Sequence, residues 1–82
     1  MELDWRDYIH ADPAILVGKP VIKGTRLSVE LILDLYAGGW SDELILQSYP
    51  RLSREALRAV FAFAADVVRQ HARAEAMQPV EV

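Results

Sequence analysis

The chain has 82 residues, of which 52% are hydrophobic and 26% charged, so it is long enough for one compact domain and too apolar for a disordered tail. It contains no cysteine, which excludes disulfide bridges and thiolate metal sites as sources of stability. Since a domain of this size buries only roughly 60–65% of its unfolded surface, we expect oligomerisation to stabilise it further. The net charge of −3 disfavours a polycation that coats nucleic acid or membrane, but it allows a local basic patch.

The first 20 residues lack the features of a targeting sequence. They are acidic, and their longest apolar run is Ala14–Val17, whereas a signal peptide needs a basic start and an apolar run of about 7–15 residues. The most apolar window, residues 59–68, is about half as long as a transmembrane helix needs and contains Asp66. We therefore predict a cytoplasmic protein with no membrane partner, folded as a single domain over residues 1–82.

Strand and turn chemistry dominates residues 1–27, which we expect to form a β-hairpin region. Pro20–Ile22 and Thr25–Leu27 are short β-prone runs, and the two residues Lys23-Gly24 lie between them. A two-residue loop that contains glycine favours a tight hairpin. Because proline cannot donate to a strand ladder, the first of these strands is expected at a sheet edge.

Helical periodicity begins at residue 28, and three serines mark the starts of three helices. Ser28, Ser41 and Ser53 each precede such a segment, where a hydroxyl caps the free backbone N–H groups. Gly38-Gly39 ends the first helix, because glycine accepts the left-handed conformation that follows a helix. Pro50 excludes the residue before it from helical geometry and so ends the second.

The third helix is predicted to run from Ser53 to about Ala76, and residues 77–82 to form a flexible tail. Three helices joined by short turns have the dimensions of a helix-turn-helix unit, which we place at residues 28–76. The predicted fold is therefore mainly α, with a short N-terminal β-hairpin followed by a three-helix helix-turn-helix unit whose third helix is long.

This third helix is apolar on two sides. At 1.5 Å per residue its roughly 23 residues span about 34 Å, which is about the length of the whole domain. Phe63 lies about 200° around the helix from Phe61, and a helix that is apolar on two sides is buried on both. We expect the rest of the chain to cover one side and a second chain to cover the other. The residues predicted to pack between subunits are Phe61, Phe63, Val67 and Val68.

Basic residues gather before and within the start of the third helix. In a helix-turn-helix unit, this part of the recognition helix enters the major groove, where arginine bonds phosphate or guanine. The alternative interpretation is a solvated helix face on which Glu55 pairs with nearby arginines. The residues predicted to contact DNA are Arg51, Ser53, Arg54 and Arg58, with Lys19, Lys23 and Arg26 as auxiliary phosphate contacts.

Catalytic and metal sites have little support. Gly18-Lys19-Pro20 does not match a phosphate-binding loop, whose lysine must precede serine or threonine at a helix start. His10 and Asp12 are too few ligands for a metal, and helix capping explains the serines without a nucleophilic role. We therefore predict no catalytic residue, no cofactor and no metal, and hence not an enzyme.

Three segments together resemble a known family. They are GKPVIKGTRLSV (18–29), AGGWSDELILQSYPRLS (37–53) and EALRAVFAFA (55–64). The chain resembles domain-of-unknown-function family 433, small proteins often described as VapB45-like antitoxins. This resemblance implies a short β region before a homeodomain-like or winged-helix-like DNA-binding unit, and pairing with a PIN-like ribonuclease toxin. It brings no catalytic residues with it.

The function expected from these observations is that of an antitoxin in a type II toxin–antitoxin system. The protein would bind its toxin, and it would bind its own promoter DNA as a dimer through the third helix. The tail after Arg73 is one candidate for the toxin-binding segment. Two alternatives remain open: a protein-interaction module with no DNA role, and a small nuclease.

Overall fold

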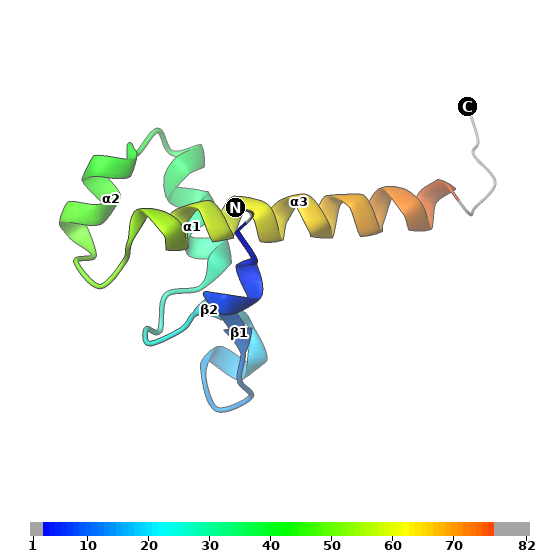
Figure 1. Cartoon of the computed structure of the whole chain (residues 1–82), viewed down its shortest axis with the longest axis horizontal. Coiled ribbons are helices and arrows are strands. Elements are labelled where there is room, and N and C mark those ends of the chain that lie inside the picture. Colours follow the sequence, from blue (N-terminus) through cyan, green and yellow to red (C-terminus); the bar gives the residue numbers. More distant parts are fainter. Residues whose placement is uncertain (1–2, 77–82) are drawn as a thin grey trace.

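The computed structural model describes the backbone of residues 3–76 and the side chains of residues 3–73 (Figure 1). The flexible tail predicted for residues 77–82 lies outside the described residues. The elements, in chain order, are the 3-10 helix η1 (Trp5–Asp7), strand β1 (Ile9–Ala11), the 3-10 helix η2 (Leu16–Gly18), strand β2 (Pro20–Ile22), and the α-helices α1 (Val29–Ala37), α2 (Asp42–Ser48) and α3 (Arg54–Ala76). The predicted fold class, mainly α with a short N-terminal hairpin, is confirmed.

All three predicted serine caps are present. The Oγ of Ser28 accepts from the Leu31 amide at 3.0 Å, and Ser41 and Ser53 do the same for the third residue after them at 3.1 Å. The end of α1 is also as predicted, because Gly38 follows its last residue and Gly39 has a φ of 93°, which glycine adopts without strain. The helix boundaries therefore follow from local chemistry.

The hairpin uses a different pair of strands from the pair we predicted. β2 pairs in antiparallel register with β1, which places Ile9 opposite Ile22 and buries both side chains in the core. Residues 25–27 form no strand, because Thr25 closes a turn instead. Its Oγ1 donates to the carbonyl of Ile22 at 2.8 Å and accepts from the Leu27 amide at 3.0 Å. Lys23-Gly24 is thus a turn between β2 and α1.

The core lies where the hairpin and the three helices meet. Its largest fully buried side chains are Ile32, Ile45, Val21 and Val60, which come from α1, α2, β2 and α3. These contacts involve the first half of α3, whereas its second half projects from the globule (Figure 1). The packing therefore fixes the start of α3 firmly against the other helices.

One side of α3 is covered differently from our expectation. We predicted a second chain over Phe63, but η1 of the same chain lies there. The Trp5 ring meets the Phe63 ring edge to face at 4.8 Å between centroids, and its Nε1–H donates to Asp66 at 2.6 Å. The expectation that this chain covers only one side of α3 is therefore wrong along Phe63. Among the described side chains of α3, the large apolar ones that stay exposed are Phe61, Val67 and Val68.

Candidate nucleic-acid interface

The turn from α2 into α3 presents a polar surface on a rigid support. Ala56, Leu57, Ala59 and Val60 are buried, so the inner face of α3 is fixed by the core. The Ser53 cap holds the first turn of α3 in place. The predicted contact residues Ser53, Arg54 and Arg58 are exposed at this end of the helix, as is Glu55.

Arg54 is held by acids at the start of α2. Its Nη1 lies 3.8 Å from the Asp42 carboxylate, and its Nη2 lies 3.5 Å from the Glu43 carboxylate. Tyr36 of α1 joins this cluster, because its hydroxyl donates to Asp42 at 2.7 Å. Partial burial and this hydrogen bond raise the pKa of Tyr36 above its ordinary value. The charge of Arg54 is thus partly neutralised within the chain.

Arg58 lies one turn further along α3 and borders the same cluster. It lines a hollow of about 90 Å³ together with Tyr36, Asp42 and Phe61. The Phe61 ring packs on the Tyr36 ring, with 4.7 Å between the centroids. In the part of the chain that the structure describes, no carboxylate forms an ion pair with Arg58. Its guanidinium is therefore available at the edge of the hollow.

On the opposite flank, Arg51 connects the α2–α3 turn to the turn after β2. Its Nη1 donates to the carbonyl of Gly24 at 3.3 Å, which brings Lys23 and Arg26 to the same region. Within residues 3–73 none of these three cations pairs with a carboxylate. We call Lys23, Arg26 and Arg51 the basic surface. Beside it lies a hollow of about 430 Å³, lined by Thr25, Arg26, Leu27, Ser48, Tyr49, Pro50 and Arg51.

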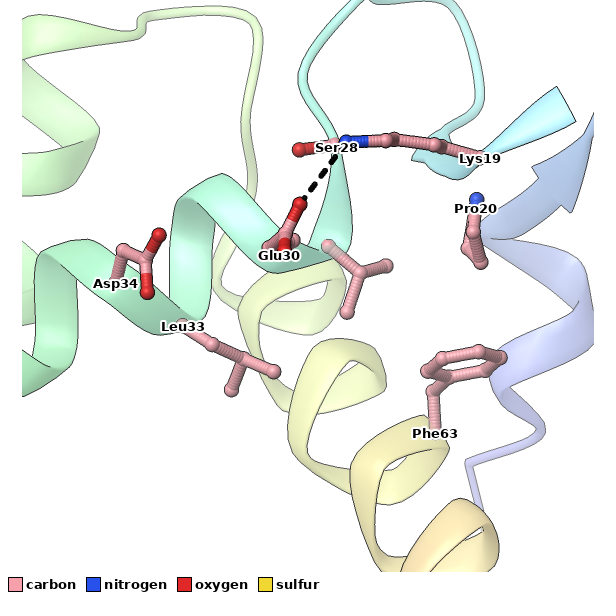
Figure 2. A pocket seen from close by; sticks show the side chains of 8 residues that line it. Lys19, Pro20, Ser28, Glu30, Leu33, Asp34 and Phe63 are labelled. Atoms are coloured by element: carbon pink, nitrogen blue, oxygen red, sulfur yellow. Dashed lines mark hydrogen bonds and ion pairs between the residues drawn. The ribbon is translucent and has the colours of Figure 1, made fainter. Parts of the chain in front are cut away.

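Lys19 does not belong to the basic surface. It forms an ion pair with Glu30 of α1, with 3.1 Å between Nζ and Oε1. Figure 2 shows this pair above a groove whose other walls include Leu33 and Asp34 of α1 and Phe63 of α3. The six basic residues predicted to contact DNA are therefore divided among three places: Arg54 and Arg58 at the start of α3, the basic surface, and this separate groove. The seventh residue, Ser53, caps α3 beside Arg54.

The sequence did not reveal which residues form ion pairs with Arg54. Asp42 and Glu43 were recognisable only as favourable acids in the first turn of a helix. Glu43 is 11 residues from Arg54 in the chain, and no sequence pattern predicts that their side chains meet. Gly24 was likewise recognised as a turn residue, with no signal that its carbonyl accepts from Arg51.

The described residues hold neither a metal site nor a membrane span. Among the side chains of residues 3–73, no three of histidine, aspartate or glutamate gather in an arrangement that could hold a metal ion. None of the helices in that range combines the length and the apolar character needed to cross a bilayer.

Comparisons with known proteins agree on one family. A family model described as "Protein of unknown function (DUF433)" matches residues 9–64. The uncharacterized protein y4eO of Sinorhizobium fredii (strain NBRC 101917 / NGR234) is 36% identical over 59 residues, which is 72% of this chain but 27% of that protein. The crystal structure of a DUF433 member from Anabaena variabilis ATCC 29413 superposes with a TM-score of 0.73 at 26% identity. That superposition covers 88% of this chain and 71% of the other.

Proposed function

Because this chain belongs to the DUF433 family, whose function is unknown, we propose its function from its own surface: it is a cytoplasmic, antitoxin-type module that binds duplex DNA as a dimer. The start of α3 enters the major groove, and the basic surface contacts the phosphates beside it. The chain spans about a quarter of the length of its relative y4eO, so the proposal concerns this chain alone.

The observation that carries the DNA proposal is the basic surface. Arg51 lies three residues before α3 and donates to Gly24, the neighbour of Lys23, and it lines one hollow together with Arg26. None of the three has a carboxylate partner among the described residues. Unpaired cations at the edge of a recognition helix suit phosphate contacts, which position a protein on a duplex. Arg54 and Arg58 then reach toward the base edges. A dimer presents two such surfaces and so doubles the number of cations that can contact phosphates.

The proposed protein partner is a PIN-like ribonuclease toxin, by the resemblance of the sequence to VapB45-like antitoxins. Charge supports this pairing, because an acidic chain suits a basic nuclease. Co-expression with the product of the neighbouring reading frame tests it. The expected result is a stable complex in which the ribonuclease is inhibited, and an active, unbound nuclease would contradict the proposal.

A specific observation favours a second candidate, a protein-interaction module without a DNA role. The ion pairs of Arg54 with Asp42 and Glu43 leave the start of α2 acidic, and acids repel phosphates. Salt titration of the affinity for duplex DNA separates the two candidates. DNA binding predicts an affinity that falls steeply above about 50 mM salt, whereas a flat response or no binding at that salt supports the interaction module.

A charge exchange at α3 tests which residues bind. We expect Arg54→Glu/Arg58→Glu to weaken binding to a labelled promoter fragment in an anisotropy titration, by less than reversal of Arg26 and Arg51 because Arg54 is already paired with acids. The matched control is Lys19→Glu/Arg69→Glu, which changes the net charge equally at cations that are paired with Glu30 and Asp66, away from the α2–α3 turn. Equal losses of DNA affinity in both double variants would show a general charge effect. Unchanged binding in the first variant would show that these α3 residues do not contact DNA.

Incubation with labelled RNA and Mg²⁺ tests the nuclease alternative.

A further inference from the structure

The hollow beside the basic surface lies between two turns. The turn after β2 forms one wall and the α2–α3 turn forms the other, and the hydrogen bond from Arg51 to the Gly24 carbonyl ties the two turns together. Its volume of about 430 Å³ falls within the range of ligand-binding clefts in proteins. The hollow is therefore large enough to receive a bulky side chain of another molecule.

The apolar part of the lining is held in place by the fold. Leu27 and Tyr49 are half-buried and pack against the core, and Pro50 continues the lining after Tyr49. The hydroxyl of Thr25 is already engaged, because it donates to the Ile22 carbonyl and accepts from the Leu27 amide. A lining that is ordered before a ligand arrives lowers the entropic cost of binding.

Two free cations stand at the rim of this hollow. Arg26 and Arg51 are exposed, both line it, and neither forms an ion pair with a carboxylate in the part of the chain that the structure describes. By contrast, Lys19 and Arg54 each have a carboxylate partner. The electrostatic complement of the rim is therefore an anionic ligand.

The apolar lining distinguishes among anionic ligands. The backbone of a duplex presents phosphates and sugars, and it carries no bulky apolar group that fills a hollow of this size. An unpaired base stacks on aromatic planes and needs hydrogen bonds for its polar edges, whereas Tyr49 is the one aromatic residue among the seven that line the hollow. A peptide combines carboxylates with a bulky apolar side chain, which is the chemistry that a cationic rim around an apolar hollow requires.

We propose that this hollow binds an acidic peptide segment of a protein partner. One bulky apolar side chain of the segment enters the hollow and covers Leu27 and Tyr49, and carboxylates on either side of it pair with Arg26 and Arg51. This inference goes beyond the proposed function and does not depend on it. Where both hold, peptide and DNA exclude each other, because the same cations serve both ligands.

An NMR titration of the full chain, with no DNA present, tests the proposal. The probe is the blocked peptide acetyl-Glu-Glu-Phe-Glu-Glu-amide, and we expect saturable shifts of the amide signals of Leu27, Ser48 and Arg51. The matched peptide with serine in place of phenylalanine should bind at least about tenfold more weakly, because it loses the buried ring. Equal affinity of the two peptides, or no shift with either, would overturn the inference.

Two variants of the chain separate the hollow from the charge. Ser48→Trp fills the hollow without changing a charge and should weaken peptide binding by roughly tenfold, while Gln47→Trp, at an exposed position outside the lining, should not. Arg26→Gln/Arg51→Gln should weaken binding by roughly three- to tenfold. Its control of equal net charge, Lys19→Gln/Arg69→Gln, should leave it unchanged. The amide spectrum of each variant shows whether it is folded, and native affinity in a folded Ser48→Trp variant would contradict the proposal.

The same spectra identify the other possible occupants. If a single-stranded thymidine hexamer shifts these amides and the peptide does not, the hollow belongs to an unpaired nucleotide. If dilution of the chain alone shifts them, a second copy fills the hollow. Either result would overturn the peptide assignment. A failure of the DNA proposal is recognised separately, because it appears in the salt titration with duplex DNA and leaves the peptide titration unaffected.

Discussion

The two flanks at the start of α3 carry the same kind of side chain in opposite electrostatic settings. On the α2 flank, Arg54 lies between Asp42 and Glu43, and its charge is partly neutralised. On the other flank, Arg51 donates to the Gly24 carbonyl and shares its surroundings with Arg26, with no carboxylate in pairing distance along the described residues. The comparison shows that an arginine's position on a helix-turn-helix unit does not decide its availability to phosphate. The side chains that surround the arginine in the fold decide whether its charge is available.

Charge reversal on the carboxylate-free flank is expected to have the largest effect. Arg26→Glu/Arg51→Glu removes two of the proposed phosphate contacts and adds two acids, so affinity for duplex DNA should fall by roughly 10- to 100-fold in an anisotropy titration. The Lys19→Glu/Arg69→Glu variant has the same net charge and should lose much less. Equal losses in the two double variants would mean that the flank has no special role.

Neutralising the acids on the α2 flank should act in the opposite direction. Asp42→Asn/Glu43→Gln frees Arg54 and removes repulsion, and we expect affinity to rise by roughly two- to tenfold, since each exposed ion pair is worth up to about 1 kcal/mol. Glu30→Gln/Asp34→Asn changes the net charge equally, away from Arg54. If this control gained as much affinity, the ion pairs of Arg54 would have no influence on binding.

The cap at Ser53 sets the geometry at the start of α3 independently of the charges on either flank. Ser53→Ala leaves the Ala56 amide without its acceptor and should lower the free energy of unfolding by about 1 kcal/mol in urea titrations. Ser41→Ala, at the start of α2, is the corresponding change on the other helix. We expect either loss to weaken DNA binding less than reversal of Arg26 and Arg51. A larger loss of DNA affinity in a cap variant than in the charge reversal would show that the position of the helix matters more for binding than the charge of Arg26 and Arg51.

The smallest expected effect is a pH dependence on the α2 flank. Burial first, and then the hydrogen bond to Asp42, raise the pKa of Tyr36. The stability that neutral Tyr36 contributes is therefore present below the ordinary tyrosine pKa of about 10 and is lost as pH rises through the higher folded value. Titration followed by tyrosinate absorbance should show an earlier ionisation in Asp42→Asn. An unchanged titration curve would mean that Asp42 does not affect the pKa of Tyr36.

Local chemistry explains which parts of the fold could be predicted. Ser28, Ser41 and Ser53 cap their helices through neighbours three residues away, and the extent of α3 follows from an uninterrupted helical pattern that reaches Ala76. The pairing of β1 with β2 was missed, because it depends on joint burial of Ile9 and Ile22 rather than on the turn between them.

Contacts between distant residues explain the rest. Trp5 reaches Asp66 across 61 positions, and this contact covers the side of α3 that we had assigned to a second chain. At the candidate site, Arg51, Arg54 and Arg58 are exposed at the turn and the helix start where the sequence placed them, but their different partners could not be predicted. The separation of Lys19 from Lys23 and Arg26 also depends on a contact across the fold, its ion pair with Glu30.

The most direct test of the account compares the salt dependence of DNA affinity in Arg51→Ala and Arg54→Ala with that of the native chain. We predict that the native chain shows a steep dependence whose slope falls by about one unit in Arg51→Ala and by distinctly less in Arg54→Ala. Equal slopes in all three proteins, or a larger fall in Arg54→Ala, would contradict it.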